Sequence, residues 1–174
     1  YKINSNNKNI IKIYFNSHKN LSYKIKKLKI NTVVHCATHY VKNHNFKDIK
    51  ELSESNILFG NIILENLKVM RVKKFVNFST VWENYDGKKD NCHNLYSAYK
   101  AGFGKIIGFY KKENKNIKFL NLVISDTFGL RDKRKKLVNL LKTNYKRNLV
   151  TRVISKNLYI NLLNVKDIVS AIKL

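Results

Sequence analysis

Proline is absent from the 174-residue chain, glycine occurs only 6 times, and no Pro- or Ser-rich linker interrupts the sequence. Without such a linker no domain boundary is indicated, so a single domain over residues 1–174 is expected. A chain of this length can bury a sizeable core, and 44% hydrophobic residues is ordinary for a globular protein. The shortage of proline and glycine beside abundant Lys, Asn and Ile matches a composition biased by A- and T-rich codons, independent of function.

Cysteine is also scarce, since Cys36 and Cys92 form no CxxC pair and stand in unrelated contexts. This usage excludes a disulfide framework and predicts a reduced, cytoplasmic protein, with Cys36 buried in a strand rather than acting as a lone thiol. No apolar run approaches the roughly 20 residues that cross a bilayer, so no membrane partner is expected. No metal site is expected either, because no acidic or cysteine cluster completes a ligand set around His35, His39 and His44.

Acidic residues are few: 35 Lys and Arg against 11 Asp and Glu give a net charge of +24. A charge of this size is typical of proteins that bind nucleic acid or acidic membranes. A dedicated binder usually concentrates its basic residues, whereas these are scattered over every segment with no basic arm and no repeat. We therefore attribute the charge to compositional bias and rank nucleic-acid binding third among the functional hypotheses.

Strands and helices are predicted to alternate along the chain. Runs rich in β-branched and aromatic residues predict strands at 10–15, 32–37, 75–79 and 117–123, with one or two more inside 148–163. Apolar residues at helical spacing predict helices at 21–30, 47–70, 95–112, 136–145 and 165–174. Strands separated by helices require a parallel sheet with crossover connections. The predicted fold class is α/β, a Rossmann-like doubly wound parallel sheet.

The stretch 74–108 contains the residues with the clearest chemistry. A predicted strand ends at the hydroxyl pair Ser79-Thr80, and after a polar loop Tyr96 and Lys100 enter a predicted helix four positions apart, hence on one face. Free tyrosine has a pKa of about 10 and is a poor base at neutral pH, but a nearby lysine ammonium lowers the pKa of the phenol. A strand-end hydroxyl with such a pair can hold a carbinol and move its proton.

Five segments, in the same order along the chain, resemble the extended short-chain dehydrogenase/reductase superfamily, and within it the NAD-dependent epimerase/dehydratase family acting on nucleotide sugars. They are VVHCATH at 33–39, Asn56 with GNIILE at 60–65, VKKFV at 72–76, the YxxxK element at 96–100 and NVKDIV at 164–169. The second resembles the helix signature N…GT..LLE, and the third the GVKKFV approach to the next strand. The stretches FSTVWENYDG, NLYSAYKAGF and DTFGLRDKRKKLVNLL are most similar to reductases and epimerases that make deoxy-sugar nucleotides.

The resemblance implies a role for each matching residue. Tyr96 would exchange a proton with the sugar hydroxyl while hydride moves to or from the nicotinamide, with Thr80 on the reacting oxygen and Lys100 on the cofactor ribose. The positions implied to bind the cofactor, NAD or NADP, are Cys36, Ala37, Thr38, Asn56, Phe78, Tyr96 and Lys100. Those implied to bind the nucleotide-sugar substrate are Ser79, Trp82, Arg131 and Arg134.

Two departures from the family pattern change what is expected. The family opens with a strand, a GxxGxxG turn and a helix that receives the pyrophosphate, and no such glycine cluster occurs here. The strand at 10–15 would then be the third of the family order, without its neighbours, and we expect no measurable NAD binding by this chain alone. Val81 and Trp82 stand where dehydratases carry an acidic pair, and Glu83 follows too late, so 4-epimerisation or 4-keto reduction is favoured over dehydration.

The predicted function is therefore that of an NAD(P)-dependent nucleotide-sugar epimerase or 4-keto reductase. The chain begins at Tyr1 with residues of mid-domain character, so a fragment is expected, in which the substrate-binding region starts after about residue 126. A non-catalytic remnant is the alternative, and an in-frame GxxGxxG turn upstream of Tyr1 would separate the two. Relatives often dimerise through two helices, here 47–70 and 95–112, so a homodimer is the expected assembly.

Overall fold

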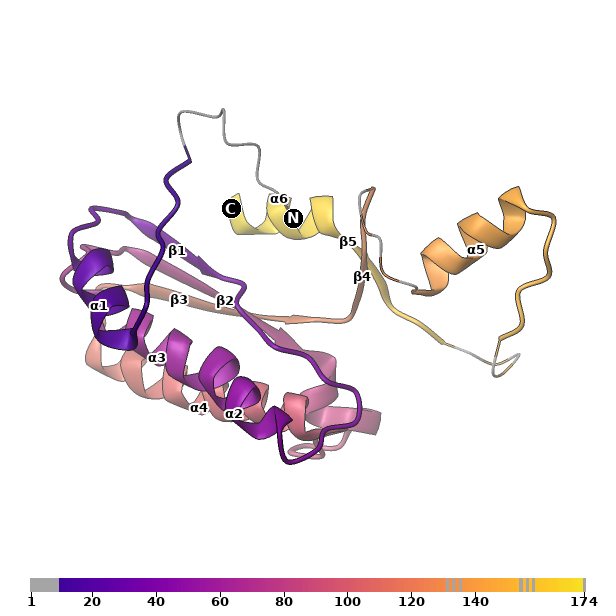
Figure 1. Ribbon diagram of the computed structural model, residues 1–174, viewed down its shortest axis with the longest axis horizontal. Coiled ribbons are helices and arrows are strands. Elements are labelled where there is room, and N and C mark those ends of the chain that lie inside the picture. Colours follow the sequence, from indigo (N-terminus) through magenta and orange to yellow (C-terminus); the bar gives the residue numbers. More distant parts are fainter. Residues whose placement is uncertain are drawn as a thin grey trace. The chain divides into compact units, whose positions relative to one another are not determined.

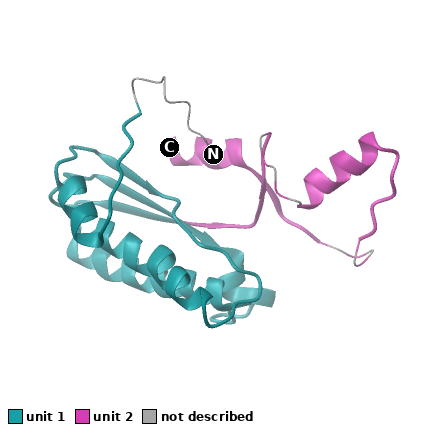
Figure 2. Ribbon diagram, viewed as in Figure 1, with its two compact units in different colours: residues 1–121 teal, residues 122–174 magenta. Residues whose placement is uncertain are grey.

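Three strands in the order β1-β2-β3 form the sheet on which the predicted site depends. The computed structural model describes residues 10–130, 132, 134, 136–153, 155, 157 and 159–173. Two compact units are present, residues 1–121 and 122–174, and Figure 2 shows them in separate colours. The start of a substrate-binding region after about residue 126 stays a prediction. None of the helices within the described ranges is long and apolar enough to cross a membrane.

The first unit places its helices against one face of the sheet, as Figure 1 shows. Its elements are α1 (His18–Lys26), β1 (Thr32–His35), α2 (Asp48–Ser53), a π-helical stretch (Glu54–Leu58), α3 (Phe59–Glu65), β2 (Lys74–Thr80), a short 3-10 segment (Val81–Gly87), α4 (Leu95–Glu113) and β3 (Lys118–Ile124). β1 pairs with β2 in parallel, with Thr32 opposite Lys74 and His35 opposite Asn77. The strands and helices alternate as predicted.

Local signals in the sequence position α4, the helix that carries the tyrosine and lysine. Asn94 caps its first turn: the Asn94 side chain accepts a hydrogen bond from the Ser97 backbone N–H at 3.0 Å, and Ser97 Oγ accepts one from the Asn94 N–H at 3.1 Å. Lys111 and Lys112 lie in the last turn, where cations complement the helix dipole. The start of α4 is therefore held by a reciprocal cap directly before Tyr96.

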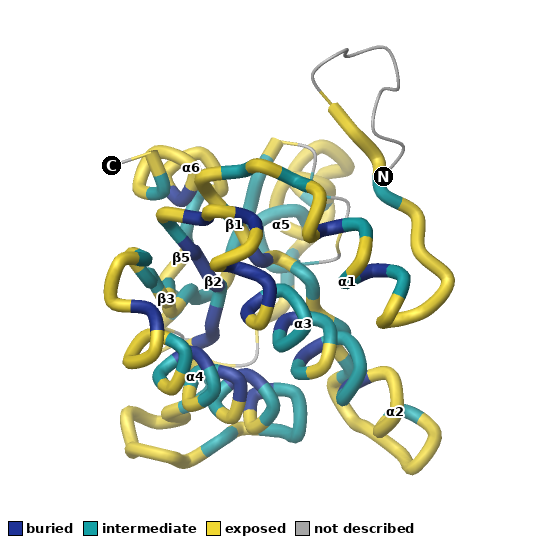
Figure 3. The backbone as a smooth tube through the Cα atoms, turned by 90° about the vertical axis from the view of Figure 1, so that its left-hand side faces the viewer, coloured by how far each residue is buried: buried dark blue, intermediate teal, exposed yellow. Residues whose placement is uncertain are grey.

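The core of the first unit lies between the sheet and the helices, and Figure 3 shows its buried stretches on β2, α3 and α4. Its buried members are Leu21, Ile25, Leu64, Leu67, Met70, Val72, Phe75, Phe103 and Ile107. At Gly60, α3 approaches α4 so closely that a Cβ built there would lie 2.3 Å from Phe103 Cζ and 3.1 Å from His35 Nε2. The glycine of the N…GT..LLE resemblance is thus a packing requirement in this chain.

A chain of hydrogen-bonded polar side chains crosses the three strands, from buried His35 to exposed Asn121. His35 Nδ1 lies 2.9 Å from Asn77 Oδ1, and Asn77 Nδ2 donates to Asn121 Oδ1 at 2.7 Å. Because an amide oxygen only accepts, Nδ1 carries the proton of a neutral ring and Nε2 is left as a buried acceptor without a partner in the described chain. Burial lowers the pKa of His35, against the Asn77 hydrogen bond that raises it. His35 is a neutral core residue.

The predicted strand at 10–15 is wrong. These residues form no strand, and the side chains of Ile11 and Tyr14 are 80% and 76% exposed. High β propensity reflects the fit of a side chain on a sheet surface, so it is expressed only where a neighbouring strand offers that surface. In the family order the third strand pairs with the second, and no strand of the described residues takes that place.

Several predicted elements exist with shifted ends. The helix expected at 47–70 stops at Glu65 and is interrupted by the π-helical stretch, and the strand expected at 32–37 stops at His35. Beyond α3 the chain turns at Arg71, which has a left-handed φ of 61°. The GVKKFV pattern has glycine at this position, and glycine adopts that conformation without steric cost.

The second unit contains β4 (Asp126–Phe128), α5 (Leu137–Lys146), β5 (Leu162–Asn164) and α6 (Val165–Lys173). β4 and β5 pair in parallel, with Asp126 opposite Leu162. The two helices agree with prediction to within one residue at each end, and one short strand lies in the region where one or two were expected. Among the described hydrophobic side chains of this unit, only Ile168 is buried.

Candidate active site

The three predicted catalytic side chains come from the end of β2 and the first turns of α4. β2 ends at Thr80, while Tyr96 and Lys100 lie one turn apart on α4, which packs against β2 and against the segment that follows it. Lys100 is only 5% exposed and Thr80 9%, and Tyr96 is half-buried. The structure thus brings residues from two separate sequence segments to one end of the sheet.

Asn56 holds the loop that follows β1. Its Oδ1 accepts hydrogen bonds from Thr38 Oγ1 at 2.6 Å and from the His39 N–H at 3.1 Å, and its Nδ2 donates to the His39 carbonyl at 3.0 Å. Asn56 is 1% exposed and lies on the π-helical stretch between α2 and α3. Thr38 is also a hydrogen-bond partner of the Tyr96 hydroxyl. Two residues predicted to bind the cofactor are therefore joined to each other and to the tyrosine.

The ionisation of Tyr96 differs from the prediction. Burial raises the pKa of this phenol, the hydrogen bond with Thr38 opposes the rise, and Glu83 and Tyr40 add to it. The lowered pKa was predicted for Lys100 acting together with a bound nicotinamide ring; without that ring, desolvation has the largest influence on the phenol and Lys100 is not among the groups that shift it. Burial also lowers the pKa of Lys100, and the neighbouring Glu83 and Cys36 oppose that shift. In the structure as it stands Tyr96 is a proton donor at neutral pH.

Buried polar atoms at this end of the sheet lack partners. Ser79 Oγ and Glu83 Oε1 are inaccessible to solvent and have no hydrogen bond in the described part of the chain. The Lys100 ammonium likewise makes neither a hydrogen bond nor an ion pair among the described residues. Buried polar groups are nearly always satisfied in native proteins, so several unsatisfied groups together indicate a place for a polar ligand.

Aromatic rings from the loops after β1 and β2 line the same region. The Tyr40 ring lies 5.1 Å from Tyr96, nearly perpendicular to it, and 6.0 Å from Trp82, and Trp82 lies 5.1 Å from His93. Tyr40 therefore links Trp82, which was predicted to bind the sugar, to Tyr96. Sequence reasoning missed Tyr40 and His93, because their relevance comes only from contacts between loops distant in the sequence.

Other predicted cofactor positions follow the strand ends. β1 stops at His35, so Cys36 begins the loop and is exposed, and the expectation of a cysteine buried in a strand is wrong. Burial raises the pKa of the Cys36 thiol, and Lys100 opposes that shift. Ala37, in the same loop, and Phe78, on β2, are half-buried. Their role toward a cofactor stays a prediction.

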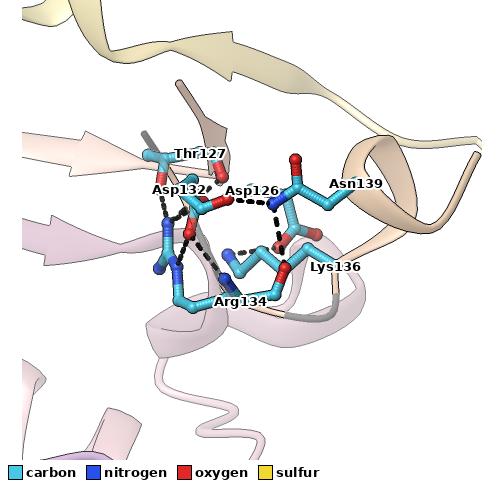
Figure 4. Close-up of polar contacts among 6 residues, drawn as sticks. All are labelled: Asp126, Thr127, Asp132, Arg134, Lys136 and Asn139. Atoms are coloured by element: carbon cyan, nitrogen blue, oxygen red, sulfur yellow. Dashed lines mark hydrogen bonds and ion pairs between the residues drawn. The ribbon is translucent and has the colours of Figure 1, made fainter. Parts of the chain in front are cut away.

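Arg134, predicted to hold the substrate diphosphate, lies in the second unit and is paired within it. Its Nε and Nη2 donate to the Asp132 carboxylate at 2.7 and 2.6 Å, and Nη2 donates to Thr127 Oγ1 at 3.2 Å. The guanidinium lowers the pKa of Asp132 to about 2. The other members of this cluster, drawn in Figure 4, are Asp126, Lys136 and Asn139. Arg131 lies outside the described residues.

Known proteins similar to this chain include a curated sugar-nucleotide enzyme. The chain is 28% identical over 111 residues to CDP-abequose synthase of Salmonella muenchen, a match that covers 64% of this chain and 37% of that protein. UDP-glucose 4-epimerase from Thermotoga maritima, solved with UDP-glucose, has a TM-score of 0.74 at 17% identity over 88% of this chain and 54% of that chain. UDP-glucose 4-epimerase of Thermus thermophilus, solved in complex with NAD, has a TM-score of 0.71 at 17% identity over 90% and 56%.

These matches confirm the predicted Rossmann-like fold, and the chain spans between 37% and 56% of the length of the three proteins. The sequence profile of the NAD dependent epimerase/dehydratase family matches residues 2–174. This family includes nucleotide-sugar epimerases, dehydratases and reductases that use NAD(P). The chain belongs to the NAD dependent epimerase/dehydratase family.

Proposed function

We propose that this chain carries the catalytic residues of an NAD(P)-dependent nucleotide-sugar epimerase or 4-keto reductase, which transfers hydride at a sugar carbinol or ketone. The main support is the end of β2, where Thr80, Tyr96 and Lys100 lie among buried polar atoms that lack partners. A chance YxxxK pair would have no reason to bury its lysine to 5% exposure. A site that binds a polyhydroxylated ligand has a reason to bury that lysine.

Each side chain has a separate task in this proposal. Tyr96 gives a proton to the sugar oxygen during ketone reduction, or takes one from the carbinol in the opposite direction. Thr80 donates a hydrogen bond to the same oxygen and orients it. Lys100 presents its uncommitted ammonium to ribose hydroxyls. The nicotinamide, when bound, supplies or accepts the hydride.

The residues present fit one part of a dinucleotide. Ser79 Oγ and the Lys100 ammonium are free to bind hydroxyls, which suits the nicotinamide ribose. The pyrophosphate calls for a glycine-rich turn, and the 6 glycines of the sequence include no GxxGxxG cluster. We therefore propose contact with the nicotinamide end and still expect no micromolar NAD binding by residues 1–174 alone.

The aromatic side chains support a sugar as substrate. The Tyr40 ring lies beside both Tyr96 and Trp82, so aromatic faces are available near the tyrosine for packing against a pyranose. The similarity to CDP-abequose synthase, named for a nucleotide-linked sugar, points the same way. Arg134 would reach a substrate phosphate only by leaving Asp132, which holds it through two hydrogen bonds.

Turnover of a nucleotide-linked 4-keto sugar with reduced nicotinamide tests the proposal, in the longest natural form of the protein that contains these residues. We expect Tyr96→Phe to lower kcat by about 10²–10⁴-fold, because the proton donor is removed. Tyr99→Phe is the matched control: this neighbouring tyrosine hydrogen-bonds Ser53 at 2.7 Å and should leave turnover nearly unchanged. Undiminished turnover in Tyr96→Phe would overturn the assignment.

A non-catalytic remnant of such an enzyme is the second candidate, and the missing glycine cluster favours it. It predicts no turnover in the parent protein under any combination of nicotinamide and nucleotide sugar. The NAD or NADP preference, the particular sugar and the homodimer stay predictions under either candidate.

A further inference from the structure

A cavity of about 660 Å³ lies at the end of the sheet away from the candidate active site. Its lining residues fall within 68–73, directly before β2, and within 112–117, between the end of α4 and β3. The Lys118 N–H donates to the Lys73 carbonyl at 2.8 Å, so β2 and β3 begin side by side at this end. β2 is 7 residues long, so roughly 20 Å of strand separate the cavity from Thr80.

Hydrogen bonds within the fold hold both lining segments. In the first, the Arg71 N–H donates to the Lys68 carbonyl at 3.1 Å. In the second, the Ile117 N–H donates to the Asn114 carbonyl at 2.9 Å, and Asn114 Nδ2 donates to the Tyr110 carbonyl at 2.7 Å. Asn114 is only 7% exposed. The backbone around the cavity is therefore positioned by the same turns that start the two strands.

The cavity is strongly basic. Five of its ten lining residues are cations, and the only carboxylate among the ten is Glu113. The cations are Lys68, Arg71, Lys73, Lys112 and Lys115. In the part of the chain that the structure describes, none of these five side chains takes part in an ion pair or a side-chain hydrogen bond. The fold thus gathers into one concave surface a part of the charge that the sequence scatters, and such a surface focuses the field on an anion.

Arg71 stands in a conformation that disfavours it. Its φ of 61° is left-handed, where glycine has no steric cost and a side chain does. Strained backbone of this kind persists mainly where a functional side chain needs the position. Here the long cationic side chain of Arg71 lines the cavity, which gives the strained residue a use.

The lining also indicates the chemistry of the ligand. Only Val72 and Ile117 are apolar, whereas pockets for ordinary small molecules are lined mainly by apolar and aromatic side chains. Charge must therefore supply most of the attraction, and Lys and Arg side chains pair best with phosphate and carboxylate groups. Five cations that converge on one cavity fit a compact anion better than the extended backbone of a nucleic acid.

We propose that this cavity binds a compact polyanion that carries two or more phosphate groups. The phosphate chain of a nucleotide and inorganic polyphosphate share this chemistry. The site lies outside the candidate active site, and its existence does not depend on the proposed function.

An NMR titration of the full chain with inorganic tripolyphosphate tests the site. At an ionic strength of about 0.15 M, where interactions between distant exposed charges are largely screened, the amide signals of residues 68–73 and 112–117 should shift saturably, and those of residues 96–100 should not. ATP is the second probe: equal affinity assigns recognition to the phosphate chain alone, tighter binding assigns it to a nucleotide, and both support the proposal. Shifts that do not saturate, or that spread over the whole surface, would overturn it.

Two double variants separate a site from the general attraction of a chain with a net charge of +24. Lys112→Gln with Lys115→Gln removes two lining charges and should weaken tripolyphosphate binding roughly tenfold. Lys105→Gln with Lys111→Gln is the matched control, because it removes the same charge from exposed positions of α4 outside the lining. It should change the affinity by less than about twofold. Equal losses in the two variants would show non-specific attraction and refute the site.

Single variants and a nucleic-acid probe complete the test. Arg71→Gly relieves the left-handed φ, so a several-fold loss of affinity in this variant cannot come from unfolding. Glu113→Gln removes the one lining carboxylate and should strengthen binding. Unchanged affinity in both would contradict the proposal. A single-stranded oligonucleotide that binds more tightly than tripolyphosphate, and loses that affinity in the lining double variant, would overturn the compact ligand in favour of nucleic acid. Circular dichroism confirms that each variant is folded.

Discussion

Gly60→Ala is the most informative single change in the scaffold of the site. The new Cβ would lie 2.3 Å from Phe103 Cζ and 2.7 Å from Phe103 Cε2, whereas ordinary contact begins near 3.4 Å. The ring would have to move by 3.4 − 2.3 = 1.1 Å. Phe103 is completely buried, and its ring lies against His35 with ring centroids 5.1 Å apart. Neither ring has free space to enter.

Two opposing terms determine the size of the effect. Alanine in place of a helical glycine stabilises by about 1 kcal/mol, while overpacking a well-filled core costs about 1–3 kcal/mol. Because the clash involves a rigid ring in a filled core, we take the upper end of that cost. The free energy of unfolding should therefore fall by about 2 kcal/mol in Gly60→Ala, measured by urea denaturation with circular dichroism.

Gly102→Ala is the matched control, because a Cβ at this exposed position of α4 meets nothing within 4 Å. It should raise the free energy of unfolding by about 0.5–1 kcal/mol, through the helical gain alone. Phe103→Leu should recover part of the loss in a double mutant with Gly60→Ala, since it shortens the clashing ring. If Gly60→Ala proved neutral or stabilising, like the control, the close approach of α3 to α4 would be refuted.

Three further outcomes are expected. Arg71→Gly should stabilise the chain by about 1 kcal/mol in urea denaturation, because Arg71 has a φ of 61°; destabilisation would argue against that turn. Burial lowers the folded pKa of His35, so its contribution to stability is complete above the unfolded pKa of about 6.5 and is lost as the pH falls below that value. This loss should be absent in His35→Gln when the free energy of unfolding is measured against pH. Arg134→Gln should raise the pKa of Asp132 from about 2 toward its ordinary value of 3.8 by carboxyl NMR; no rise would exclude the guanidinium as its cause.

How much could be predicted depended on how local each signal was. α4 begins at its Asn94 cap and extends through regular apolar spacing, and both features lie within a few neighbouring residues. β2 has a mainly apolar run, interrupted by Asn77, that ends at hydroxyls. Because parallel strands separated by helices leave few topologies, these local signals also predicted the fold class. Thr80, Tyr96 and Lys100 followed from the same two segments.

The remaining features depended on contacts between distant parts of the chain. Residues 10–15 have strand propensity but no strand, since a strand also needs a neighbour. Cys36 is exposed because β1 ends at His35, two residues sooner than the predicted strand. The pKa of Tyr96 is raised because burial, which no spacing rule reports, has the largest influence on it.

By itself, then, the sequence determined the family, the order of strands and helices, and the hydroxyl, tyrosine and lysine expected at the end of β2. Only the tertiary structure decided the surroundings of those side chains, which include Tyr40 beside Tyr96 and Asn56 hydrogen-bonded to the loop after β1. The reason is physical. A motif records which residues are close along the chain, whereas desolvation and charge interaction depend on every element that folds back against them.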